Sequence, residues 1–239
     1  MNYKSKIYRN EKVTDKVYLM EVDYQEPGNP GQFYMLKAWG NDPLLGRPFG
    51  ICDIKENKLS FLYEVVGRGT KILSNLNQDQ TIELIGPLGN GFPLTDQKAA
   101  IVAGGCGLAP MVYLAKQLPI KPDVYLGYKS DAYAVELIKP YADKIIIASE
   151  DGSSGQPGFI TDYLEASDYP VVYGCGPDPM MRALKQLCKD STLYLSMDAY
   201  MACGVGACLG CTIETVDGLQ RVCMEGPVFN GKDVFNDES

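Results

Sequence analysis

Histidine is absent from all 239 residues of the chain. Without it there can be no Ser-His-Asp triad, no histidine general base, no Cys-His zinc finger and no histidine-ligated metal. Any metal must therefore be held by cysteine, aspartate or glutamate, and chemistry that needs a proton shuttle near neutral pH is disfavoured. An electron- or hydride-carrying cofactor fits such a chain better.

Positive charge is also scarce. Lysine and arginine total 22 against 30 aspartate and glutamate residues, so the net charge at pH 7 is −8. Such a balance argues against nucleic acid or an anionic membrane surface as the main partner. The longest uncharged stretch, residues 99–115, is broken by three glycines and Pro110, and so predicts a buried strand, turn and helix start instead of a membrane span.

Eight cysteines are too few for a disulfide scaffold in a chain of this length. The charged and polar first residues predict no signal peptide. We therefore expect a cytoplasmic protein, in which unpaired cysteines serve a metal, redox chemistry or plain core packing. With 46% hydrophobic residues, the chain has ample material for one large domain or two modest ones.

The first part of the chain, residues 1–94, predicts an antiparallel β-structure. Short strand-like runs alternate with turns rich in proline, glycine and asparagine, a pattern typical of a small β-barrel or sandwich. The strands expected include residues 16–24, 31–38, 58–66 and 80–86, with one short helix at 70–76.

From residue 95 to 198 the pattern changes to alternating strands and helices. Apolar strands are expected at residues 99–103, 123–128, 144–149, 170–174 and 192–197. Helices are expected near residues 110–118, 131–142, 158–166 and 178–188. This α/β alternation predicts a doubly wound parallel sheet. A third, glycine-rich module, residues 199–239, holds half of the cysteines.

The cysteines of the third module have the spacing C-x4-C-x2-C-x11-C: Cys203, Cys208, Cys211 and Cys223. This is the plant-type ferredoxin arrangement for a 2Fe–2S cluster. Interspersed glycines allow a tight loop that aims backbone N–H groups at sulfur. A two-residue turn at Asp217-Gly218 predicts a hairpin that pairs Thr212 with Cys223 and so brings Cys223 beside Cys211. The alternative is structural zinc on the same cysteines.

A glycine-rich loop follows the first strand of the predicted parallel sheet, with Gly104, Gly105, Gly107 and Pro110. Glycine lets the backbone approach a pyrophosphate, and the next helix offers free N–H groups at its start. The loop predicts a dinucleotide site, although a plain tight turn can contain the same residues. Cys175, Gly176 and Pro177 follow the fourth strand, at the sheet edge where ligands dock.

Two acidic residues, Glu150 and Asp151, end the third strand of this sheet. A carboxylate there can accept hydrogen bonds from ribose hydroxyls and repel a 2′-phosphate, which predicts NAD in preference to NADP. The alternative is a solvated acidic turn.

Several barrel residues suit a nucleotide cofactor. Arg47 can pair with a phosphate, Gly69-Thr70 can cap a short helix that holds one, and Phe49 or Tyr63 can flank an aromatic ring. Core aromatics and a surface arginine explain these residues equally well.

Longer motifs occur in one order across nearly the whole chain: RPFGI, LYEVVGRGT, GPLGNGF, GGCGLAP, EDGSSGQPGFITDYL, YGCGPDPMM, MACGVGACLGC and RVCMEGPVF. In these motifs the chain resembles the electron transfer subunits of class 1B dihydroorotate dehydrogenase, within the ferredoxin–NAD(P) reductase-like superfamily. The resemblance implies FAD in the barrel, NAD on the parallel sheet and a 2Fe–2S cluster on the four cysteines. FAD would be held by Arg47, Pro48, Phe49, Gly50, Leu62, Tyr63, Glu64, Gly69 and Thr70. NAD would be held by the loop from Gly104 to Pro110, with Cys175, Gly176 and Pro177 near the nicotinamide.

In that family, electrons from dihydroorotate pass from the FMN of a catalytic subunit through the 2Fe–2S cluster and FAD to NAD+, in pyrimidine biosynthesis. The resemblance implies an NAD-linked oxidoreductase subunit with no assigned catalytic side chain, in a heterotetramer of two copies of each subunit. Two departures stand out: Gly50 replaces a serine of the flavin motif, and residues 198–201 replace a Glu-Glu-Arg-Met stretch. The alternatives are a sister reductase subunit serving ferredoxin, hydrogenase or sulfur compounds, and a zinc-bearing interaction module.

Overall fold

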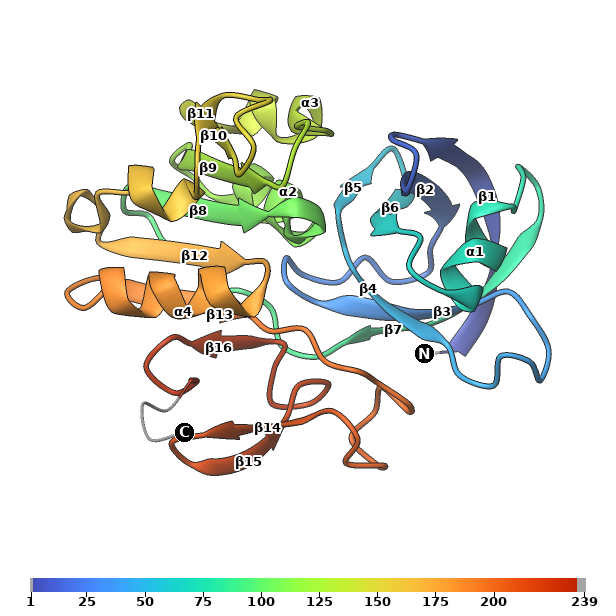
Figure 1. Ribbon diagram of the computed structural model, residues 1–239. Helices are drawn as coiled ribbons and strands as arrows, with labels where there is room; N and C mark the ends of the chain where they lie inside the picture. Colours follow the sequence, from blue (N-terminus) through green and yellow to red (C-terminus); the bar gives the residue numbers. More distant parts are fainter. Residues whose placement is uncertain (1, 236–239) are drawn as a thin grey trace.

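The computed structural model describes residues 2–235, in which two seven-stranded sheets stand side by side and a C-terminal segment runs beneath them (Figure 1). The first sheet is antiparallel, in the order β4-β3-β7-β1-β2-β6-β5. Its elements are β1 (Asn2–Lys12), β2 (Val17–Asp23), β3 (Phe33–Lys37), β4 (Arg47–Gly50), β5 (Asp53–Lys55), β6 (Lys58–Glu64), α1 (Arg68–Ser74) and β7 (Thr81–Leu88). The sheet curls, since Phe49 on β4 and Tyr63 on β6 have ring centroids 5.4 Å apart. The predicted antiparallel barrel is confirmed as a half-barrel.

Strand β1 lies at the centre of this sheet, between β7 and β2, yet the sequence prediction omits it. Most of its side chains are charged or polar, and only Ser5 and Ile7 are buried. Two inward positions are too few to show the period-2 pattern of a half-buried strand. The strand forms because its backbone supplies hydrogen bonds to both neighbours.

The second sheet has the order β11-β10-β9-β8-β12-β13-β16. Its strands are β8 (Ala99–Gly104), β9 (Asp123–Tyr128), β10 (Lys144–Ser149), β11 (Gln156–Pro157), β12 (Val171–Cys175), β13 (Thr192–Ser196) and β16 (Val228–Asn230). All neighbours are parallel except β13 and β16. The predicted doubly wound parallel sheet is confirmed. Because the strand order reverses at β8, the ligand crevice of such a sheet falls between β8 and β12.

Two of the helices predicted for this sheet form as expected: α2 (Leu108–Gln117) and α4 (Asp178–Leu187). The helix predicted at 131–142 is reduced to α3 (Val135–Ile138) and the 3-10 turn η2 (Lys139–Tyr141). The helix predicted at 158–166 is replaced by the 3-10 turns η3 (Ile160–Tyr163) and η4 (Ala166–Asp168). Both predictions are wrong in extent. Ala134, with φ of +55°, stops a right-handed helix on the N-terminal side of α3, and the extended backbone of Leu164, φ −91° and ψ 114°, ends η3 after four residues.

The C-terminal segment contains a hairpin of β14 (Thr212–Thr215) and β15 (Gly218–Arg221). Its turn is Val216-Asp217, so the predicted turn at Asp217-Gly218 is wrong by one residue and Thr212 pairs with Arg221.

Contacts outside the hairpin fix this register. The Val216 N–H donates to Asp233 O at 2.9 Å, and Thr215 forms a bridge with Val234. These contacts outweigh the preference of Asp-Gly for the turn. The predicted neighbour of Cys223 is still correct, because the Val222 N–H donates to Cys211 O at 3.0 Å.

The C-terminal segment is fastened to the rest of the fold at several places, of which two involve backbone pairing. Strand β16 pairs with β13 at the edge of the second sheet. In the linker between the sheets, the Asn90 N–H donates to Gly226 O at 2.6 Å, and its side-chain amide donates to the carbonyl oxygens of Met224 (3.0 Å) and Glu225 (2.9 Å). The segment predicted as a separate module therefore shares a sheet and a junction with the others.

The apolar core follows the same pattern. One cluster fills the barrel, and a second joins one face of the parallel sheet to barrel residues such as Leu62. A third joins all three parts, including Met35 of β3, Val102 of β8 and Cys223. Among residues 2–235, no helix has the length and apolar content to cross a bilayer.

An ion pair joins the barrel to the parallel sheet. Lys116 on α2 donates from Nζ to Asp53 Oδ1 at 2.7 Å and to Ile54 O at 2.6 Å. We expect Lys116→Met to lower the free energy of unfolding by about 1–3 kcal/mol, because a largely buried carboxylate loses its charged donor. Urea titration followed by near-UV circular dichroism measures this. The control Lys12→Met breaks an exposed pair with Asp15 and should lower the free energy of unfolding much less, because water screens that pair; equal losses would contradict the expectation.

Candidate functional site

The glycine loop after β8 and the segment after β12 lie backbone to backbone at the carboxyl edge of the parallel sheet. The loop forms the 3-10 turn η1 (Gly105–Gly107), and a Cβ on Gly107 would lie 2.2 Å from Cys175 O. A Cβ on Gly104 would lie 2.7 Å from Pro177 Cδ. Glycine is required at both positions because the neighbouring segment fills the space of a side chain. The two segments predicted for a dinucleotide thus meet at the crevice between β8 and β12.

Two thiols at this edge, Cys106 and Cys175, are protonated near neutral pH. Burial raises the pKa of Cys175 to about 12. Burial also raises the pKa of Cys106, although a hydrogen bond with Tyr133, Sγ to Oη 3.5 Å, acts in the other direction. The sequence analysis missed Tyr133, since it expected a helix there. The loop after β9 instead turns this ring onto the glycine loop.

Asp151 lies exposed in the turn after β10. Its carboxylate accepts a hydrogen bond from the Ser153 N–H at 2.9 Å, and hydrogen bonding by Ser153 lowers the pKa of Asp151 below its ordinary value. The turn is tied to the loop after β9, because the Ala132 N–H donates to Ser154 Oγ at 3.0 Å. The carboxylate is thus anionic and accessible at neutral pH, as binding of ribose hydroxyls requires; that role stays a prediction.

The phosphate site predicted for the flavin combines Arg47 of β4 with the start of α1. A Cβ on Gly69 would lie 2.8 Å from Arg47 Nε, so only glycine lets the guanidinium cross so closely. An open cleft of about 560 Å³ adjoins the helix and is lined by Val65, Gly67, Arg68, Lys71 and Ile72. The cations of this region suit the phosphates of a dinucleotide.

Gly69 and Thr70 do not cap α1, contrary to the prediction. The cap is Gly67, and the helix begins at Arg68. The Thr70 hydroxyl instead accepts hydrogen bonds from the N–H groups of Val66 and Gly67, both at 3.0 Å. Thr70 therefore stabilises the helix entrance from the third helical position, as the second member of a capping box does.

The other predicted flavin residues differ in accessibility. Leu62 and Tyr63 are buried in the barrel, where the Tyr63 hydroxyl donates to Asn10 Oδ1 at 3.0 Å, and Glu64 is exposed. Pro48 and Phe49 are half-buried on β4. At the end of β4, a Cβ on Gly50 would lie 3.6 Å from Pro110 Cβ. The segments predicted for the flavin and for the dinucleotide therefore lie close together at the end of β4.

The four cysteines predicted to hold the cluster come from the loop before β14 and the turn after β15. Backbone amides face their sulfurs: the N–H of Gly206 donates to Cys223 Sγ at 3.2 Å, that of Val205 to Cys203 Sγ at 3.5 Å, and that of Gly210 to Cys208 Sγ at 3.5 Å. The loop depends on Gly204 and Gly206, whose φ angles are +70° and +78°.

The cysteines lie in two pairs, since Cys208 contributes to lowering the pKa of Cys203 and Cys211 contributes to raising that of Cys223. Burial raises the pKa of Cys203, but amide hydrogen bonds, led by that from Val205, outweigh burial and bring it to about 7. Burial raises the pKa of Cys223 to about 11. Within residues 2–235, no three His, Cys, Asp or Glu side chains converge on a single-ion site. A 2Fe–2S cluster takes two protein ligands at each iron, and the two pairs fit that requirement.

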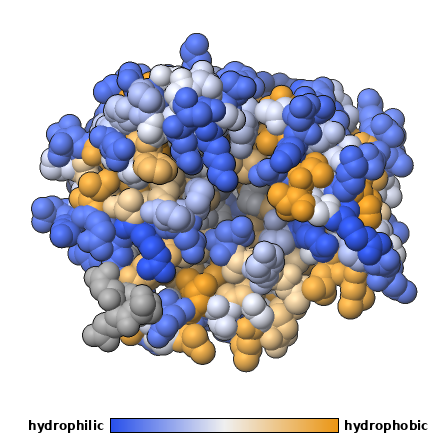
Figure 2. Space-filling view, viewed as in Figure 1, coloured by the Kyte–Doolittle hydropathy of each residue, from blue (hydrophilic) through white to orange (hydrophobic). Residues whose placement is uncertain are grey.

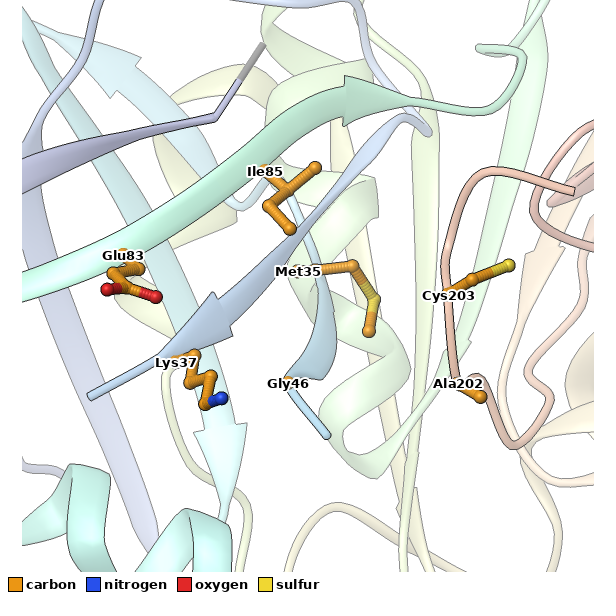
Figure 3. Close-up of a pocket in the computed structure, with 7 residues that line it drawn as sticks. All are labelled: Met35, Lys37, Gly46, Glu83, Ile85, Ala202 and Cys203. Carbon is orange, nitrogen blue, oxygen red and sulfur yellow. The ribbon is translucent and has the colours of Figure 1, made fainter. Parts of the chain in front are cut away.

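The cluster loop packs against the outer face of the barrel at a small pocket (Figure 3). The pocket has a volume of about 60 Å³ and is lined by Met35, Lys37, Gly46, Glu83, Ile85, Ala202 and Cys203. The Met35 side chain points toward the loop, and a Cβ on Gly204 would lie 2.7 Å from Met35 Cγ. Met35 also pairs with Pro48 across β3 and β4. The sequence analysis missed Met35, because a buried strand methionine gives no sign of the segment that it contacts.

Comparison with known proteins places the chain in one family. A family model described as the iron-sulfur cluster binding domain of dihydroorotate dehydrogenase B matches residues 198–235. A dihydroorotate dehydrogenase B (NAD(+)) electron transfer subunit from Clostridium acetobutylicum is 45% identical, over 97% of each chain. The chain belongs to this family. The Clostridium perfringens subunit is 40% identical, again over 97% of each chain, and the resemblance inferred from the motifs is confirmed.

Solved structures support the fold. The NADH-dependent reduced ferredoxin-NADP oxidoreductase has a TM-score of 0.88 at 23% identity, covering 98% of this chain and 90% of that one. A ferredoxin NADP+ reductase from Neisseria gonorrhoeae has a TM-score of 0.60 at 16% identity, covering 79% of this chain and 91% of that one. The predicted ferredoxin–NAD(P) reductase-like fold is confirmed.

Anaerobically purified protein should contain about two iron and about two acid-labile sulfide per chain, with an EPR signal only after reduction. Cys208→Ser or Cys223→Ser should abolish this signal and leave flavin absorbance largely intact, because the barrel does not depend on the cluster ligands. Cys188→Ser, at a buried cysteine outside the loop, is the matched control and should keep the signal. Stoichiometric zinc without sulfide would contradict the cluster.

Proposed function

We propose that this chain is an electron transfer subunit that carries electrons from a dihydroorotate dehydrogenase catalytic subunit to NAD+. One observation carries the proposal: β4, which holds the predicted flavin residues Arg47 to Gly50, lies close to both other sites. Met35, the partner of Pro48 across β3 and β4, faces the cluster loop at Gly204, and Gly50 at the end of β4 lies near Pro110 of the dinucleotide loop. The flavin segment thus occupies the middle of a three-part path.

FAD, when bound, exchanges electron pairs with NAD and single electrons with a 2Fe–2S cluster. The chain's own residues bind and orient these groups. Arg47 and the basic side chains of α1 supply charge for the flavin phosphates, and the start of α2 supplies free N–H groups for the nicotinamide dinucleotide. Cys203, Cys208, Cys211 and Cys223 supply the thiolates. The family and the fold support the cofactor set predicted from the sequence.

No side chain of this chain has to act as a general acid or base in such a relay. The sequence has no histidine, and burial keeps Cys106 and Cys175 protonated beside the dinucleotide loop. Oxidation of dihydroorotate requires a base that takes a proton while hydride leaves. We therefore assign that step to a partner subunit containing FMN, in a cytoplasmic heterotetramer with two copies of each subunit.

We place the contact with this partner on the C-terminal segment. Hydrophobic side chains gather along the lower edge of the molecule, over this segment (Figure 2). Its exposed apolar residues include Val205, Leu209, Val216 and Leu219. Leu209 also has a left-handed backbone conformation, φ +58°, between two cluster cysteines. Such strain in an exposed leucine supports a contact role for the loop.

NADH should be preferred over NADPH, because a 2′-phosphate beside the ionised Asp151 would be repelled. Asp151→Ala should narrow the ratio of the two kcat/KM values, measured with a dye acceptor, by roughly two- to fivefold, the size of an exposed charge interaction. Asp190→Ala removes an equally exposed carboxylate at the opposite edge of the sheet and should leave the ratio unchanged. Equal turnover of NADH and NADPH by the wild-type protein would contradict the assignment.

The isolated chain should pass electrons from NADH to artificial acceptors but should not oxidise dihydroorotate. Coexpression with an FMN-containing dihydroorotate dehydrogenase subunit from the same genome should yield a stable complex with dihydroorotate:NAD+ activity. Oxidation of dihydroorotate by the chain alone, or failure of the cognate pair to associate, would refute the proposed function and favour a sister reductase.

The docking surface can be tested separately by size-exclusion chromatography of the complex. Leu219→Glu should weaken assembly without loss of NADH:dye activity, because it buries a charge at the contact and leaves the barrel unchanged. Ile120→Glu, at an exposed isoleucine after α2, is the control and should assemble normally. Normal assembly of both variants would place the interface elsewhere.

A further inference from the structure

Arg221, the last residue of β15, reaches back to the cluster loop. Its Nη1 donates to Gly206 O at 3.0 Å. This carbonyl shares a peptide group with the Ala207 N–H, which contributes to lowering the pKa of Cys203. The preceding amide, Gly206 N–H, donates to Cys223 Sγ at 3.2 Å. The Arg221 guanidinium is therefore hydrogen-bonded to the stretch of backbone whose amides face Cys203 and Cys223, one cysteine of each pair.

Glu225 holds the guanidinium in this position. Arg221 Nε donates to Glu225 Oε2 at 3.0 Å, Nη2 donates to Oε1, and the Arg221 backbone N–H donates to Oε2 at 2.8 Å. The backbone of Glu225 is held in turn, since its carbonyl accepts a hydrogen bond from Asn90 Nδ2 at 2.9 Å. A bidentate pair of this kind fixes the orientation of the arginine fork.

The stability of an ion pair does not explain this arrangement. The two side chains are 33% and 35% exposed, and pairs with such exposure contribute little to the free energy of folding. The geometry is instead specific for the loop carbonyl, because it leaves Nη1 free to donate to Gly206.

We propose that Arg221 is a positioning residue that raises the reduction potential of the cluster by polarising the amides that donate to its cysteine sulfurs. This rests on the proposed function, which puts a 2Fe–2S cluster on those cysteines. Reduction adds negative charge, which a nearby cation and stronger N–H···S hydrogen bonds stabilise. In the series Nη1–H···O=C–N–H···S, the first hydrogen bond strengthens the second through the peptide group between them.

Glu225 has two opposite effects in this arrangement. Its carboxylate orients Arg221, but its negative charge disfavours the reduced cluster. Removing one charge or the other should therefore shift the potential in opposite directions. A purely structural clamp would give shifts of the same sign, because loss of either side chain would loosen the same loop.

The test is an EPR-monitored redox titration of the cluster in the FAD-containing protein. Arg221→Gln should lower the equilibrium constant for reduction about tenfold, which is about 59 mV for a one-electron couple. Arg221→Lys keeps the positive charge but loses the bidentate guanidinium, and it should lower this equilibrium constant less than Arg221→Gln does. Glu225→Gln keeps a hydrogen-bond acceptor for the guanidinium but removes the negative charge that disfavours the reduced cluster. This variant should raise the equilibrium constant for reduction.

Arg9→Gln is the matched control. Arg9 lies on β1 and is also paired with a glutamate, Glu21, at 2.8 Å, but it belongs to the barrel sheet. The variant has the same change in net charge and should leave the potential unchanged. A shift equal to that of Arg221→Gln would show a general charge effect and overturn the inference.

An unchanged potential in Arg221→Gln, or a fall in both Arg221→Gln and Glu225→Gln, would also overturn it. If Arg221→Gln loses its cluster, Arg221→Lys and Glu225→Gln decide the matter, because their shifts must have opposite signs. Iron and sulfide analysis of the wild-type protein distinguishes a failure of the proposed function from a failure of the role assigned to Arg221. A protein without the cluster would refute the proposed function, whereas an intact cluster with an unmoved potential would refute only the role of Arg221.

Discussion

The hydrogen bonds of Asn90 to the turn at residues 224–226 join the linker between the two sheets to the chain just beyond the last cluster cysteine. The C-terminal segment needs such an attachment, because its own hairpin has only two strands and such hairpins are marginal alone. Strand β16 adds a second attachment on β13, and the shared apolar cluster around Met35 adds a third. The cluster loop is therefore held against both sheets at once.

This attachment explains why the three sites can form one path. Each site is built where segments from different parts of the chain come close together. Gly107 approaches the backbone of Cys175, Gly50 approaches Pro110, and Gly204 approaches Met35. At Gly107 and Gly204 the missing side chain allows the two segments to come closer than other residues permit, whereas at Gly50 an added Cβ would lie at an ordinary contact distance of 3.6 Å. Short separations between neighbouring sites follow from these contacts.

Cysteine thiols have different pKa values beside the dinucleotide loop and in the cluster loop. Burial without amide donors raises the pKa of Cys175 to about 12, and its thiol stays protonated beside the dinucleotide loop. At Cys203 the amides of the glycine-rich loop reverse the effect of burial and bring the pKa to about 7. Amide donors thus favour the thiolate at Cys203, whereas at Cys223 burial outweighs the Gly206 amide and raises the pKa to about 11.

Local patterns in the chain were sufficient to predict the half-barrel, the doubly wound sheet, the glycine loop and the spacing of the four cysteines. Each of these is encoded within a short window, by alternation of apolar residues or by the reach of one loop. Tertiary contacts decided the rest. Strand β1 forms because two neighbours pair with it, and the hairpin turn moves to Val216-Asp217 because residues 233–234 bind its end. Met35, Tyr133 and Arg221 gained their roles from segments distant in sequence, since a side chain's own neighbours along the chain do not determine what it contacts across the fold.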